Sequence, residues 1–88
     1  MSVSDTRENL ARLTREYPNQ LLMIRSEHDV DKINIMNSEL HGPFDFGDAQ
    51  ITKTVETALT AGKQVAVQGA GRDRVLVHTA KSGSKLFR

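Results

Sequence analysis

The chain lacks cysteine and tryptophan altogether, and it contains only one tyrosine, three phenylalanines and two prolines. Without cysteine there is no disulfide, no thiol nucleophile and no thiolate zinc site. The fold must therefore be stabilised by its core alone. With so few aromatic residues, that core has to consist mainly of Val, Ile, Leu and Met.

Long hydrophobic runs are also absent. The longest, Leu21 to Ile24, has four residues, whereas a membrane-spanning helix needs roughly 20. Residues 1–5 lack the basic and apolar regions of a secretory signal. We therefore expect a cytoplasmic protein with no membrane association.

The length of 88 residues, with 38% apolar and 26% charged side chains, predicts one small globular domain. We place this domain at residues 1–80 and expect residues 81–88 to form a flexible basic tail, with docking of Leu86-Phe87 as the alternative. A core this small is only marginally stabilising, so homodimerisation is a plausible way to bury more apolar surface.

A net charge of +1 hides a strong asymmetry between the two halves of the chain. Residues 1–50 carry five basic and nine acidic side chains, while residues 51–88 carry seven basic and two acidic ones. Such a division fits internal pairing between the halves, a bipolar surface, or a basic patch for an anionic partner.

Two helices are expected. Asp5 and Glu8 have the spacing of a capping box, Leu10, Leu13 and Tyr17 follow at helical intervals, and Pro18 ends the first helix. The second begins after Asp48 as the N-cap and ends at Gly62 in the left-handed C′ position. Its apolar face comprises Ile51, Val55, Ala58 and Leu59.

The apolar run within residues 20–26 predicts a buried strand, and the alternation at residues 33–35 predicts a second strand that pairs with it as a hairpin. A helix is the competing interpretation for residues 30–40, because Val30, Ile33, Met36 and Leu40 also follow helical spacing. The Gly42-Pro43 pair predicts a loop over residues 41–47.

A further hairpin is expected where Val65 and Val67, and then Val75 and Val77, alternate with other residues on either side of a glycine-containing loop. The chain then reads as two successive helix–strand–strand units. This order predicts an α+β domain of αββαββ order, with a four-stranded, mainly antiparallel sheet and two helices packed on one face.

No motif in the sequence indicates catalysis, so we expect no enzymatic activity, no cofactor and no metal. Gly69-Ala70-Gly71 lacks the third glycine and the following helix of a dinucleotide-binding loop and is interpreted as a hairpin turn. The oxygen and imidazole ligands around the Gly-Pro loop match no metal-ligand spacing. They are Glu39, His41, Asp45 and Asp48.

Two binding hypotheses remain. The first is a small protein-binding module, a regulator or inhibitor of viral or mobile-element type that occupies a partner's surface, with Phe44, Asp45 and Phe46 as contact residues. Phe44 and Phe46 are expected either to be exposed or to fold back over the small aliphatic core. The alternative is a nucleic-acid-binding module that uses the basic residues of the C-terminal hairpin and tail. These are Arg72, Arg74, Lys81, Lys85 and Arg88.

Overall fold

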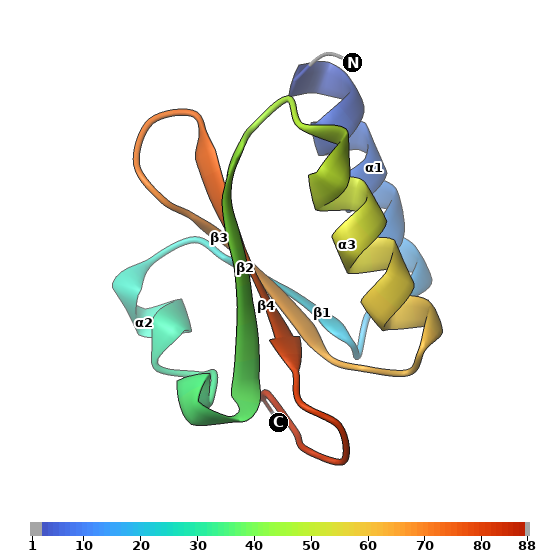
Figure 1. Cartoon of the computed structure of the whole chain (residues 1–88), viewed down its shortest axis with the longest axis vertical. Helices are drawn as coiled ribbons and strands as arrows, with labels where there is room; N and C mark the ends of the chain where they lie inside the picture. The colour runs from blue at the N-terminus through green and yellow to red at the C-terminus, as the bar shows by residue number, and fades with distance from the viewer. Residues whose placement is uncertain (1–2, 88) are drawn as a thin grey trace.

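The structure is a computed structural model that describes residues 3–87, except for the side chains of residues 3–5 and 27. Two long helices lie side by side on one face of a four-stranded sheet (Figure 1). In chain order the elements are α1 (Val3–Glu16), β1 (Leu21–Ile24), α2 (Glu27–Val30), the 3-10 helix η1 (Ile35–Asn37), β2 (Ser38–Asp45), α3 (Ala49–Thr60), β3 (Val65–Gly69) and β4 (Arg74–Ala80).

The α+β class is confirmed, but the strands pair differently from the prediction. The order across the sheet is β1-β3-β4-β2. β3 and β4 form the expected antiparallel hairpin, whereas β1 pairs parallel to β3, with Leu21 opposite Val65. β2 pairs antiparallel to β4 at the far edge, so the predicted hairpin between the first two strands is wrong.

The first helix buries the predicted stripe but begins earlier than expected. Leu10 and Leu13 are buried and Tyr17 packs against the same cluster. Because α1 begins at Val3, Asp5 lies within its first turn and is not the N-cap. The helix ends before Pro18, which disfavours helical geometry in the residue preceding it.

The second long helix, α3, has both predicted ends. The Asp48 carboxylate accepts a hydrogen bond from the Gln50 amide at 2.9 Å. At the other end Gly62 has a φ of +79°, and the amides of Gly62 and Lys63 donate to the carbonyls of Leu59 and Ala58. This is the bonding pattern of a Schellman motif.

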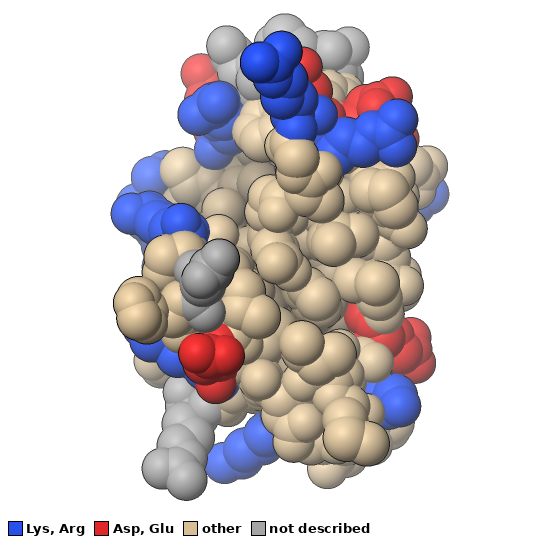
Figure 2. Space-filling view, turned by 90° about the vertical axis from the view of Figure 1, so that its left-hand side faces the viewer, with Lys and Arg blue, Asp and Glu red and all other residues tan. Residues whose placement is uncertain are grey.

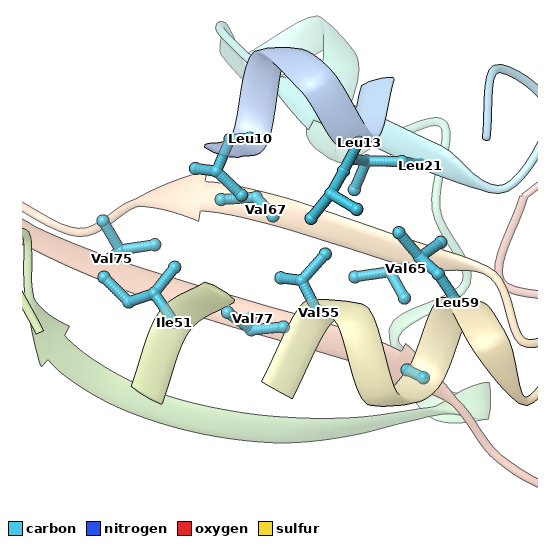
Figure 3. Packing of buried hydrophobic residues seen from close by; sticks show 11 residues of the cluster. Leu10, Leu13, Leu21, Ile51, Val55, Leu59, Val65, Val67, Val75 and Val77 are labelled. Carbon is cyan, nitrogen blue, oxygen red and sulfur yellow. The ribbon is translucent and has the colours of Figure 1, made fainter. Parts of the chain in front are cut away.

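The main core lies between the two helices and the sheet (Figure 3). All four hairpin valines predicted to share a face are buried there. They meet the predicted apolar face of α3, the buried leucines of α1 and Leu21 of β1. At roughly 25 cal/mol per Å² of apolar area, this cluster is the principal source of stability in a chain without cross-links.

A smaller cluster covers part of the opposite face of the sheet. Leu86, which is fully buried, packs with Ile33 and Ala66. The Oε1 atom of Gln64 accepts hydrogen bonds from the amides of Leu86 and Phe87 at 2.7 and 3.0 Å. Residues 86 and 87, placed by the sequence analysis in a flexible tail with docking as the alternative, therefore lie docked against the sheet.

Residues 33–35 do not form the expected strand. Ile33 is buried in this smaller cluster, and the amide of Asn34 donates to the carbonyl of Leu86 at 2.7 Å and not to β1. A long helix over residues 30–40 is not formed either, because α2 ends at Val30 and η1 spans three residues.

The segment predicted as a loop contains much of β2. Residues 38–41 pair with residues 77–80 of β4, and pairing resumes at Phe44 after an irregularity between His41 and Phe44. Gly42 has a φ of +105°, and a Cβ atom there would lie 2.9 Å from the carbonyl oxygen of Val75. The Gly-Pro pair thus sits in a bulge inside the strand, where an edge strand tolerates the missing proline amide.

Candidate functional site

The predicted aromatic contact residues lie against the core. Phe44 and Phe46 are half-buried and pack against the main cluster, whereas Asp45 between them is exposed. The amide of Phe46 donates to the carbonyl of Asp73 at 2.7 Å, which ties the end of β2 to the β3–β4 loop. Of the three predicted partner-binding residues, Asp45 is therefore the most accessible.

The predicted basic residues are divided between the two ends of the sheet. Arg72 and Arg74 lie at the β3–β4 loop, and Lys81 and Lys85 follow the other end of β4. The seven residues of β4 separate these pairs by roughly 20 Å at the usual rise of an extended strand. Arg88 lies outside the described residues, so four of the five predicted residues are placed and they do not form one surface.

Sequence reasoning missed three exposed apolar side chains in β2 and in η1 just before it, which we call the apolar patch: Ile35, Met36 and Leu40. Their exposed fractions are 56%, 84% and 58%. Ile35 and Met36 also line a hollow of about 650 Å³ between residues 30–37 and residues 85–87. The face seen in Figure 2 includes a broad area without charged side chains.

The only signal for this patch in the sequence was the apolar spacing from Val30 to Leu40, which was interpreted as a choice between strand and helix. Because β2 is an edge strand, the outer side of its backbone is not paired within the sheet. The patch therefore lies next to main-chain groups that another chain can bind.

A second feature missed by sequence reasoning is a groove at the end of the molecule that carries the β3–β4 loop. It has a volume of about 610 Å³, and Arg7, Arg25 and Arg74 line it together with apolar side chains. Lys and Arg side chains gather at this end in Figure 2. We call this hollow the arginine groove. Its three arginines come from α1, from the residue after β1 and from the start of β4.

His28 lies in α2, whereas His41 and His78 lie on the paired strands β2 and β4 and contact different side chains. The Nε2 atom of His41 lies 2.9 Å from the Thr79 hydroxyl, and that of His78 lies 2.8 Å from Oε1 of Gln68. His78 is 5% exposed, and burial lowers its pKa below the ordinary value of 6.5. Among the described side chains, no three metal-ligating groups come together.

The acidic residues near the Gly-Pro bulge have separate surroundings. Asp48 caps α3, and Oδ1 of Asp45 lies 3.7 Å from Nε of Arg74. Asp29 lies in α2, away from the bulge. The Lys32 ammonium, 2.9 Å from its carboxylate, and a hydrogen bond from the backbone amide of Arg25 lower the pKa of Asp29 below 3.8. Each of these three carboxylates contacts a different group.

Comparisons of the chain with protein-family models, with curated protein sequences and with solved structures found no significant match. No helix within residues 3–87 is long and apolar enough to cross a membrane. The function is therefore inferred from the apolar patch and the arginine groove.

Proposed function

We propose that this protein is a small protein-binding module, a regulator or inhibitor that acts by occupying a partner's surface in the manner of many viral and mobile-element proteins. The observation that carries the proposal is the apolar patch beside the edge strand β2. Large apolar side chains that are more than half exposed are typical of a surface that a partner covers.

The arrangement favours a partner that adds a strand to the sheet. An edge strand offers main-chain hydrogen bonds, and exposed side chains beside it provide specificity. The bulge between His41 and Phe44 limits regular pairing to residues 38–41, where Leu40 lies. The adjoining hollow, lined by Ile35 and Met36, provides room for an apolar side chain of the partner.

The test compares the double variant Met36→Ser plus Leu40→Ser with the wild type for capture of a binding partner from source-cell lysate. The side chains replaced are exposed, so the thermal unfolding midpoint should remain within a few degrees of the wild type. We expect capture to be lost in the double variant and retained in Ala61→Ser, which alters another exposed residue. Unchanged capture by the folded double variant would contradict the assignment.

Asp45 tests the original loop prediction separately. Because Phe44 and Phe46 pack against the core, truncating them would also destabilise the fold. Asp45→Asn removes only a charge from an exposed side chain. Reduced partner capture by this variant would support a contact at the bulge, and capture equal to wild type would exclude Asp45 from the interface.

Nucleic-acid binding is the second candidate, favoured by the proximity of Arg72 and Arg74 to the arginine groove. Duplex and single-stranded oligonucleotides should then bind with an affinity that falls steeply with salt. Arg72→Gln plus Arg74→Gln should reduce that slope, while Lys81→Gln plus Lys85→Gln at the opposite end should not. Absence of binding at low salt would remove this candidate.

A further inference from the structure

The arginine groove lies where two neighbouring parallel strands end. β1 and β3 run in the same direction, and the groove is lined by Ile24 and Arg25 at the end of β1 and by Gly69 at the end of β3. In sheets with parallel strands, the carboxyl ends are where ligands commonly bind, because the following loops diverge there and leave a crevice. The volume of about 610 Å³ is in the range of small-molecule sites.

The described lining of the groove is strongly positive. The charged residues of the lining are Arg7, Arg25, Arg74 and one carboxylate, Asp73, so the lining has a formal net charge of +2. The only ion pair that these three guanidinium groups form with described side chains is between Arg74 and Asp45, at a long 3.7 Å. Arg7 lies over the ring of Phe46, 5.0 Å from its centroid.

The floor of the groove is apolar. Leu10, Met23, Val67 and Val75 from the edge of the main core line it, and Phe46 adds an aromatic ring. Such a floor accommodates the flat or apolar body of a ligand whose anionic group is held by the arginines. An inorganic ion makes no use of such a floor, so the two features together favour an organic anion.

Gly69 leaves unfilled space at this floor. Its φ lies outside the left-handed region, and a Cβ atom built on it would meet no atom within 4 Å. Neither backbone conformation nor packing within the chain therefore requires glycine there. Gly69 pairs with Val75, so its missing side chain would point to the helix-covered face on which the groove opens.

We propose that the arginine groove binds a phosphorylated small molecule with a flat, apolar body, of the chemical class of nucleoside monophosphates. A phosphate monoester carries a charge close to −2 near neutral pH, which matches the net charge of the lining. Arg7, Arg25 and Arg74 hold the phosphate, and the apolar floor takes the base. This site is separate from the apolar patch and goes beyond the proposed protein-binding function.

The test is a calorimetric titration with the four common nucleoside 5′-monophosphates at low salt, repeated with the parent nucleosides and with inorganic phosphate. We expect at least one nucleotide to bind with a dissociation constant below about 1 mM. Its parent nucleoside and inorganic phosphate should each bind at least about tenfold more weakly. Arg7→Gln plus Arg25→Gln should weaken nucleotide binding by about tenfold or more.

Two variants separate binding from folding. Gly69→Val places a side chain in the groove and is expected to abolish nucleotide binding while the protein stays folded by circular dichroism. Arg15→Gln removes a guanidinium from the last turn of α1, outside the groove, and should bind like the wild type. The proposal would be overturned if none of the four nucleotides bound. It would also be overturned if Gly69→Val and the double variant Arg7→Gln plus Arg25→Gln bound the nucleotide as tightly as the wild type does.

A short oligonucleotide with and without a 5′-phosphate distinguishes the source of the ligand. Tighter binding of the phosphorylated form, lost in the groove variants, would identify the end of a nucleic acid as the source of the same nucleotide chemistry. Weaker binding than the free nucleotide would identify a metabolite. If the oligonucleotide bound equally well with and without the 5′-phosphate, and equally well to Gly69→Val, while no free nucleotide bound, the groove would not be a nucleotide site.

Discussion

Replacing Leu86 with alanine is expected to destabilise the protein by about 2 to 3 kcal/mol, although only two residues follow it in the sequence. The side chain is fully buried against Ile33 and Ala66. Fully buried leucines usually cost about 2 to 5 kcal/mol on truncation to alanine, and the lower part of this range applies because a terminal segment can relax into the cavity.

The measurement is the free energy of unfolding from chemical denaturation, together with the thermal midpoint. For a domain of this size, 1 kcal/mol corresponds to about 4 to 8 °C, so the midpoint should fall by roughly 10 to 20 °C. The neighbouring Lys85 is exposed, and Lys85→Ala should change the free energy of unfolding by less than about 0.5 kcal/mol.

A second variant tests the backbone contacts of the same segment. Gln64→Leu removes the acceptor of the Leu86 and Phe87 amides and should cost about 1 to 3 kcal/mol. If Leu86→Ala changed the free energy of unfolding by no more than Lys85→Ala does, the segment would not be docked in solution, and the reasoning about the second face of the sheet would be refuted.

Three further predictions concern single residues. Burial lowers the pKa of His78 below 6.5, so as the pH falls the unfolded chain is protonated at this residue before the folded chain is. The free energy of unfolding should therefore fall as the pH drops below 6.5, by at most about 1.4 kcal/mol per pH unit, until the pKa of the folded state is passed. Denaturation at a series of pH values should show a smaller fall for His78→Gln. Asp48→Ala removes the N-cap of α3 and should cost about 1 kcal/mol in the free energy of unfolding, whereas Asp48→Asn, which retains an acceptor, should cost less. Gly42→Ala should destabilise by about 1 to 3 kcal/mol because of its φ of +105° and the approach of its Cβ to the backbone, and a thermal midpoint equal to wild type would show that the bulge adopts another conformation.

The candidate surfaces were the least predictable part of the molecule. The arginine groove combines residues from α1, β1, β3 and β4 with Phe46, which follows β2, so only the folded chain brings Arg7, Arg25 and Arg74 together. The loop prediction left open whether Phe44 and Phe46 were exposed or folded back over the core, and it did not place Phe44 in a strand. In the structure a bulge accommodates Gly42, and pairing resumes at Phe44.

The sequence by itself determined the elements whose signals are local. The limits and buried face of α3 follow from hydrogen bonds and side-chain spacing within a few residues, from the Asp48 cap to the left-handed Gly62. The β3–β4 hairpin likewise joins strands that are neighbours in the chain, so alternation of its valines was sufficient to assign both strands and their buried face.

Only the tertiary structure decided which strands pair across long separations and what covers the second face of the sheet. β1 gains a parallel partner 44 residues further along the chain, where Leu21 meets Val65, and no local pattern specifies that choice. Residues 33–35 do not form a strand because Ile33 packs with Leu86 and the amide of Asn34 donates a hydrogen bond to the Leu86 carbonyl. Burial of apolar surface between distant segments outweighs a weak local preference for strand, and this places the apolar patch at the edge of the sheet.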